Sequence, residues 1–178
     1  MLKILTAPNK ILSSRAKKIT KVDKKLKKLV NEMIICLEKQ KNPQGVGLAA
    51  PQVGYNLQLF IIKPFENEKP QIIINPKIVK FINKKKVGKL DKKKQRRSLE
   101  GCLSIPKIWA PIQRAEEIVL EYTDINGKNL TAKFSGFHSV IIQHEIDHLN
   151  GIIFTQRAIE QKKQLYEETE DKLEKITA

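Results

Sequence analysis

The sequence predicts a domain that combines helices with antiparallel strands, and three observations indicate this. Apolar residues recur every three to four positions over residues 22–37, a spacing typical of an amphipathic helix. Asn126 and Gly127 separate two runs rich in β-branched and apolar residues, which predicts a hairpin turn. Residues 136–149 carry a second helical segment, which Asn150 and Gly151 should end with a left-handed cap.

The remaining elements are expected from local signals along the chain. Thr20 and Asp23 form a Thr-x-x-Asp capping signal, so the first helix should begin at Thr20. It should end near Pro43, because proline restricts the residue before it. We also expect a short helical turn within residues 8–16, strands at residues 57–62, 71–74, 118–124, 128–134 and 152–154, and a C-terminal helix over residues 157–178.

Composition limits the class of protein. A chain of 178 residues with 40% hydrophobic residues is sufficient for one packed domain, here residues 1–178, and excludes a wholly disordered chain. The longest unbroken apolar run has five residues, which is too short to span a membrane. The two cysteines are too few for a disulfide scaffold and fit a reducing compartment. We therefore expect a soluble, cytoplasmic protein.

Positive charge is concentrated in two segments. The formal net charge is +15, and residues 1–41 carry 12 basic and 3 acidic side chains, while residues 77–97 carry 11 basic and 1 acidic. Repulsion between like charges predicts a mobile basic loop at residues 83–97. Such charge can attract a polyanion such as RNA, or can simply solvate the surface, and the scarcity of aromatic residues leaves both interpretations open.

The strongest chemical motif is His144-Glu145-Ile146-Asp147-His148. Residues four apart lie on one face of a helix, so the two imidazoles can bind one metal ion, with Glu145 beside them. A catalytic metal usually has three protein ligands, and His138, Cys36 and Cys102 are the other candidates. Cys36 falls beside the apolar stripe of the first helix and is interpreted as a core residue. Cys102 follows Gly101, which permits a close backbone approach, and is our predicted third ligand.

A glycine-rich segment at residues 45–54 is the third candidate region. It matches neither the Gly-x-Gly-x-x-Gly nor the Gly-x-x-x-x-Gly-Lys phosphate-binding pattern. It can be a tight turn, or a backbone that another chain approaches closely. The side-chain amide of Gln52 could donate a hydrogen bond to an oxyanion there.

Taken together, three motifs carry a resemblance to a known family. Gly-Val-Gly-Leu-Ala-Ala-Pro-Gln, Glu-Gly-Cys-Leu-Ser and Gln-His-Glu-Ile-Asp-His resemble, in the same order, the signature motifs of peptide deformylases. The resemblance implies an α+β fold in which antiparallel sheets surround a central metal-binding helix, with an N-terminal and a C-terminal helix. It also implies a hydrolase that removes the formyl group from formylmethionyl nascent polypeptides.

The resemblance assigns roles to particular residues. Cys102, His144 and His148 would bind one divalent metal, with Fe(II) expected and zinc, nickel or cobalt possible. Glu145 would act as general acid and base, and the Gln52 amide and the Leu103 backbone N–H would stabilise the oxyanion. The substrate-binding residues would be Val46, Gly47, Gly101, Phe137, Val140 and Ile141, of which the three on the helix share one face with His144. Independently of the resemblance, Glu100, Arg114 and Asp147 are candidates to orient the ligands, or else form ordinary surface ion pairs.

Two other functions remain open at this point. A zincin-like peptidase would leave Cys102 and Gln52 unexplained, and a non-enzymatic basic RNA-binding protein would leave the histidine motif unexplained. For the hydrolase we expect a bacterial cytoplasmic location, a monomer without membrane contact, and transient binding near the ribosome exit region. The basic residues 77–97 are the expected contact with ribosomal RNA.

Overall fold

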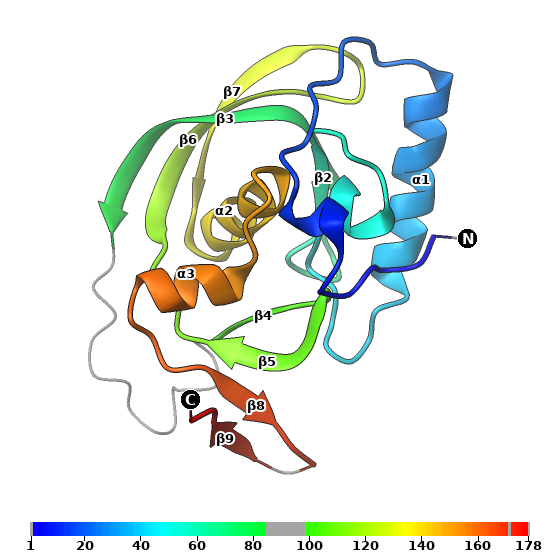
Figure 1. Cartoon of the computed structure of the whole chain (residues 1–178). Helices are drawn as coiled ribbons and strands as arrows, with labels where there is room; N and C mark the ends of the chain where they lie inside the picture. Colours follow the sequence, from blue (N-terminus) through cyan, green and yellow to red (C-terminus); the bar gives the residue numbers. More distant parts are fainter. Residues whose placement is uncertain (1, 85–98, 171, 178) are drawn as a thin grey trace.

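The computed structural model describes residues 2–84, 99–170 and 172–177 of the chain, and most of the predicted basic loop at residues 83–97 lies outside them. Figure 1 shows the arrangement of the elements. The elements are η1 (Lys10–Ser13), α1 (Lys24–Glu38), β1 (Gly47–Ala49), η2 (Ala50–Val53), β2 (Leu59–Ile62), β3 (Gln71–Lys84), β4 (Glu100–Cys102), β5 (Ile105–Ala110), β6 (Ala115–Thr123), β7 (Asn129–Ser135), α2 (Gly136–Leu149), α3 (Phe154–Glu160), β8 (Tyr166–Glu168) and β9 (Leu173–Lys175).

The strands form two antiparallel sheets. One has the order β1-β2-β3-β6-β7 and the other the order β4-β5-β8-β9. Helix α2 lies between them, with β3, β6 and β7 curving over it and β4 and β5 beneath it in Figure 1. The expected α+β fold, with antiparallel sheets around a central helix, is confirmed.

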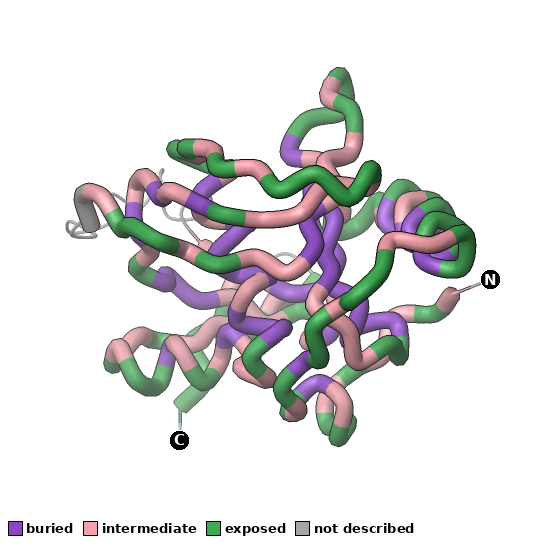
Figure 2. The backbone as a smooth tube through the Cα atoms, turned by 90° about the horizontal axis from the view of Figure 1, so that it is seen from above, coloured by how far each residue is buried: buried purple, intermediate pink, exposed green. Residues whose placement is uncertain are grey.

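Strand β2 explains why the five-stranded sheet is covered on both faces. Its side chains alternate, because successive residues of a strand point to opposite faces. Leu59 and Ile61 pack with the apolar face of α1, whereas Phe60 and Ile62 pack with Ile142 of α2 and its neighbours. All four are fully buried. Figure 2 shows the same pattern, with buried segments gathered in the middle of the molecule.

The first helix is confirmed, although it begins later than predicted. The side chain of Asp23 accepts a hydrogen bond from the backbone N–H of Leu26 at 2.9 Å, so Asp23 and not Thr20 is the N-cap residue. The helix ends at Glu38, a few residues before Pro43. Cys36 is buried in the core that α1 forms with β2, as the sequence indicated.

Strand β3 is longer than the predicted strand at residues 71–74. The pairing with β6 shifts register between Ile74 and Lys77, so Pro76 lies at a bulge, where its missing N–H is tolerated. Asn75 has a φ of 50° at this point, and its side-chain amide pairs with the backbone of Ile19. The bulge lets the strand continue past Pro76, where the sequence predicted its end.

The hairpin and helix that lead to the site are confirmed. Asp124 closes the β6–β7 turn by accepting backbone hydrogen bonds from Asn126 and Lys128, each 2.8 Å long, and Gly127 has a φ of 81°. Helix α2 spans the predicted range, and Gly151 follows with a φ of 73°. A Cβ at Gly151 would lie 2.8 Å from the carbonyl oxygen of Ser13, so a side chain is excluded there.

The C-terminal part differs from the prediction. Residues 152–154 do not form a strand, because α3 begins at Phe154, and the predicted helix over 157–178 is wrong beyond Glu160. Lys162 has a φ of 52°, which turns the chain out of the helical direction. The chain then forms the hairpin β8–β9, and β8 pairs with β5. The open edge of β5 offers this segment backbone partners, so it pairs there as a strand instead of continuing the helix.

Candidate metal and catalytic centre

Helix α2 brings His144, Glu145 and His148 to the centre of the molecule. The two imidazole rings are 4.9 Å apart at their centroids and nearly perpendicular. All three side chains are buried. His144 and His148 are one helical turn apart, so both rings reach the same point between the sheets, as the sequence predicted.

Cys102 approaches this pair from strand β4. Its Sγ lies 3.2 Å from Nε2 of His148, and one ligand atom each of Cys102, His144 and His148 lie within 4.8 Å of one another. In the described ranges this is the single group of three His, Cys, Asp or Glu residues so arranged. A thiolate and two imidazoles are the donors that zinc and iron sites use in proteins, so the residues present fit a divalent metal.

The electrostatics of Cys102 favour the thiolate. Burial by itself disfavours the charged form, but the imidazoles of His148 and His144 outweigh it and lower the pKa of Cys102 to about 5. The pKa of His144 is raised, because the carboxylate of Glu100 and the Cys102 sulfur outweigh the effect of burial. A deprotonated sulfur is the form that binds a cation.

Glu145 lies beside the three ligand candidates without a hydrogen-bond partner for its Oε2 atom. Burial raises its pKa to about 7, although the two imidazoles act in the opposite direction. A carboxyl group with such a pKa can accept and return a proton near neutral pH. Gly47 of β1 faces it so closely that a Cβ there would overlap the Glu145 carboxylate and lie 2.8 Å from Ile141.

Gln52 is held with its amide nitrogen at the site. Its Oε1 accepts a hydrogen bond from the backbone N–H of Ala49 at 2.8 Å. Its Nε2 consequently points to Cys102 Sγ, at 3.7 Å, and to Ser104 Oγ, at 3.2 Å. The short helix η2 therefore presents a fixed hydrogen-bond donor next to the ligand candidates.

Behind His144 lies a buried network of charges. Nδ1 of His144 is 2.7 Å from Oε1 of Glu100, and Arg114 holds both oxygens of Glu100. Arg114 also contacts Asp147 at 2.5 Å, and Asp147 in turn accepts hydrogen bonds from Arg157. Although burial opposes it, the charges of His144 and Arg114 lower the pKa of Glu100 to about 2. The structure thus brings the three predicted residues together: Glu100 contacts His144 directly, and Arg114 joins Glu100 to Asp147.

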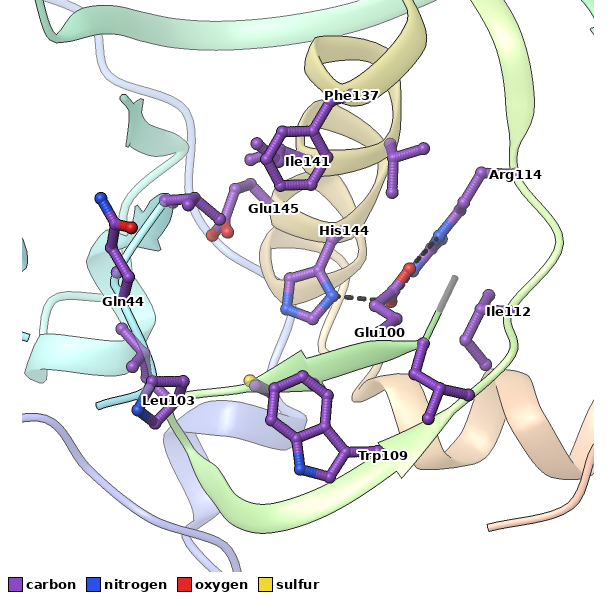
Figure 3. Close-up of a pocket in the computed structure, with 18 of the residues that line it drawn as sticks. Gln44, Glu100, Leu103, Trp109, Ile112, Arg114, Phe137, Ile141, His144 and Glu145 are labelled. Atoms are coloured by element: carbon purple, nitrogen blue, oxygen red, sulfur yellow. Dashed lines mark hydrogen bonds and ion pairs between the residues drawn. The ribbon is translucent and has the colours of Figure 1, made fainter. Parts of the chain in front are cut away.

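A cavity of about 540 Å³ opens onto these groups. Figure 3 shows His144 and Glu145 on α2 at one wall and Trp109 on β5 at the other. The predicted substrate-binding residues Val46, Gly47, Gly101, Phe137, Val140 and Ile141 all line it, as do Gln52 and Leu103. Its lining is mostly apolar, which suits the side chain of methionine.

Two residues of this region are not among the site residues assigned from the sequence. Trp109 lines the cavity because the β4–β5 pairing sets it opposite Gly101. The sequence signal for that pairing was weak, since β4 has only three residues. Arg157 joins the charge network from α3, and an isolated arginine gives no sequence signal for such a contact.

Comparisons with known proteins find relatives of this chain over most of its length. A family model described as "Polypeptide deformylase" matches residues 1–164. The peptide deformylase of Dictyoglomus turgidum is 42% identical over 151 residues, which are 85% of this chain and 88% of that protein. The crystal structure of the Thermotoga maritima peptide deformylase superimposes with a TM-score of 0.76 at 34% identity, over 88% of this chain and 97% of that one.

The chain belongs to the polypeptide deformylase family. It is a metal-dependent hydrolase that removes the formyl group from formylmethionyl polypeptides. A second solved deformylase, from Legionella pneumophila, gives a TM-score of 0.76 at 33% identity, over 88% of this chain and 85% of that one. The alternatives of a zincin-like peptidase and an RNA-binding protein find no support. No helix in the described part of the chain has the length and hydropathy to cross a membrane.

Proposed function

We propose that Cys102, His144 and His148 hold the metal of this deformylase and that Glu145 moves the proton. The observation that carries the proposal is the convergence of these four buried side chains at the base of one apolar cavity. When bound there, a divalent cation supplies Lewis acidity, which polarises the formyl carbonyl and increases the acidity of water.

Glu145 has the position that a general acid and base needs. Its Oε2 has no protein partner and can therefore accept a proton from the attacking water. It then returns the proton to the nitrogen of methionine as the bond to the formyl carbon breaks, so that formate and a free amine are released. Glycine at position 47 leaves the carboxylate the space that it occupies, which a side chain there would take.

Gln52 and Leu103 stabilise the oxyanion that forms on the formyl oxygen. The amide of Gln52 is already oriented by Ala49, so little reorganisation is needed during the reaction. Leu103 follows Cys102 directly, and its backbone N–H is the second donor in the proposal. Loss of one such donor typically costs about 3–4 kcal/mol of barrier.

The substrate binds along β1 and against α2. The backbone at Val46 and Gly47 pairs with the peptide as an added strand. The methionine side chain enters between Val46 and the helix face formed by Phe137, Val140 and Ile141. Gly101 lines the same cavity, and its lack of a side chain leaves room for the ring of Trp109 beside the peptide.

Further features of the proposal concern the metal and the cell. We infer that the physiological metal is Fe(II), with zinc, nickel or cobalt as substitutes, and that the protein acts as a cytoplasmic monomer.

Lys77 and Lys80 are exposed on β3 and begin the basic stretch 77–97, which would contact ribosomal RNA. Deletion of residues 84–95 should weaken ribosome binding at low salt, and unchanged binding would contradict that contact.

The central experiment measures formate release from a formyl-Met peptide under anaerobic conditions, with Fe(II) or Ni(II) supplied. We expect Glu145→Ala to keep its metal but to lose about 10²–10⁴-fold in kcat. Glu121→Ala, at an exposed position of β6, is the control and should match the wild type. Full turnover by Glu145→Ala, or cleavage of unformylated peptides by the wild type, would refute the proposal.

A further inference from the structure

Trp109 is the only tryptophan of the chain, and it forms the cavity wall opposite helix α2. Figure 3 shows its ring on β5, across the cavity from the side chains that α2 presents. The α2 wall is assigned to methionine. The wall at Trp109, with its apolar neighbours Leu99 and Ile112, is therefore available to the part of the substrate that follows methionine.

Two contacts fix the plane of the indole ring. On one side the ring lies on the backbone of Gly101, so closely that a Cβ at Gly101 would be 2.8 Å from its Cε3 and Cζ3 atoms. At its edge, Nε1 donates a hydrogen bond to Oε2 of Glu168 at 3.0 Å. A ring supported in this way presents its other face to the cavity without having to reorient.

Glu168 belongs to the C-terminal hairpin, and none of the described residues of that hairpin lines the cavity. Strand β8 pairs with β5 in a register that sets Tyr166 opposite Trp109. The hairpin itself is short, and its outer strand is largely exposed. The hydrogen bond from Trp109 to Glu168 therefore links a peripheral element to the substrate cavity.

We propose that Glu168 is a positioning residue that holds Trp109 as an apolar platform for the side chain next to methionine in the substrate. The proposal rests on the assigned deformylase function and extends it to peptide selection. An aromatic face adds to the affinity for apolar and aromatic side chains through stacking and buried area. Small polar side chains gain little from it.

The test compares formyl-Met-Phe-Ser with formyl-Met-Ser-Ser. Removal of the hydrogen bond in Glu168→Ala should raise KM for the phenylalanine peptide about three- to tenfold, a change that corresponds to one net hydrogen bond. KM for the serine peptide should change less than about twofold, and kcat should stay constant for both. Glu168→Gln retains an acceptor and should restore the wild-type KM. Glu167→Ala, at the exposed neighbouring position, is the matched control.

A second measurement reports on Trp109 directly. Because the chain has one tryptophan, its fluorescence has a single source. In Glu168→Ala, acrylamide should quench this fluorescence more strongly than in the wild type and in Glu167→Ala. Trp109→Phe keeps an aromatic ring but lacks the N–H donor, so adding Glu168→Ala to it should have no further effect on KM.

The outcomes separate this inference from the function on which it rests. Formate release by the wild type from either peptide tests the function alone. An equal change of KM for both peptides in Glu168→Ala, or unchanged quenching of Trp109, would overturn the positioning role even with full activity. A selective rise in KM together with stronger quenching would establish it.

Discussion

The two sheets meet at the metal site but are stabilised differently. The five-stranded sheet has apolar cores on both faces, which α1 and α2 supply, and every residue of its strand β2 is buried. The four-stranded sheet has a small core around Cys102, Ala110 and Phe154. It is joined to α2 by polar contacts, namely Cys102 with His148 and Arg114 with Glu100 and Asp147.

The two sheets therefore contribute differently to the stability of the fold and to the chemistry of the site. The five-stranded sheet and α2 form the scaffold, since apolar burial is the main favourable term in folding. The four-stranded sheet supplies the sulfur and one wall of the cavity, and its position depends on buried charges. Truncation of an apolar side chain in the first sheet should act on folding alone, whereas changes to the buried charges that hold the second sheet should also act on the metal and the substrate.

The largest expected effect is at Arg114, which joins β4 to helix α2 through two carboxylates. Arg114→Leu leaves Glu100 and Asp147 buried without their shared partner, and removal of one partner from a buried pair typically costs about 3–5 kcal/mol. Urea unfolding followed by circular dichroism measures the loss. A cost under about 1 kcal/mol, the range of exposed pairs, would show that this network does not hold β4 against α2.

A slightly smaller effect is expected from Ile61→Ala in β2. Ile61 is fully buried beneath α1, and truncation of such a residue costs about 2–5 kcal/mol. The metal content of the remaining folded protein should not change, because the site lies on the other face of the sheet. Metal loss at unchanged stability would contradict the division between scaffold and site.

Glu100→Gln should act on the metal more than on the fold. Glu100 orients His144 through Nδ1, and loss of such an outer partner typically lowers metal affinity about 10- to 100-fold. Competition with a chromophoric chelator measures the affinity. Glu117→Gln, on a partly exposed glutamate of β6, is a control that should leave it unchanged. Equal affinities in all three proteins would contradict the orienting role.

The smallest effect is expected from Leu173→Ala in β9. Leu173 is only partly buried at the edge of the four-stranded sheet, so its truncation should cost less than about 1 kcal/mol. The same urea experiment compares it directly with Ile61→Ala. A cost equal to that of Ile61→Ala would mean that the C-terminal hairpin belongs to the scaffold.

The sequence predicted the parts that depend on local patterns. The spacing of His144 and His148 specified a helical ligand pair, and the Asn126-Gly127 turn specified the hairpin before it. The capping signal predicted the start of α1 to within a few residues. Cys102 could be predicted as the third ligand because the chain has only one other cysteine and one histidine outside the helical pair.

The predictions that were wrong concern elements that depend on contacts between distant segments. The C-terminal segment is rich in helix-forming residues, yet the open edge of β5 pairs with β8 and overrides that preference. Pro76 would end a regular strand, but a strand with a bulge can continue through it. The bulge forms because β3 pairs with β6 both before and after Pro76. The contacts of Arg157 and Glu168 arise from the fold and have no local pattern.

The most direct test of the central claim is X-ray absorption spectroscopy of the zinc-loaded protein. One sulfur at about 2.3 Å and two imidazole nitrogens at about 2.0–2.1 Å are predicted around the metal. In Cys102→Ser the sulfur signal should disappear. A site without sulfur in the wild type, or an unchanged spectrum in Cys102→Ser, would contradict the assignment of Cys102, His144 and His148 as the metal ligands.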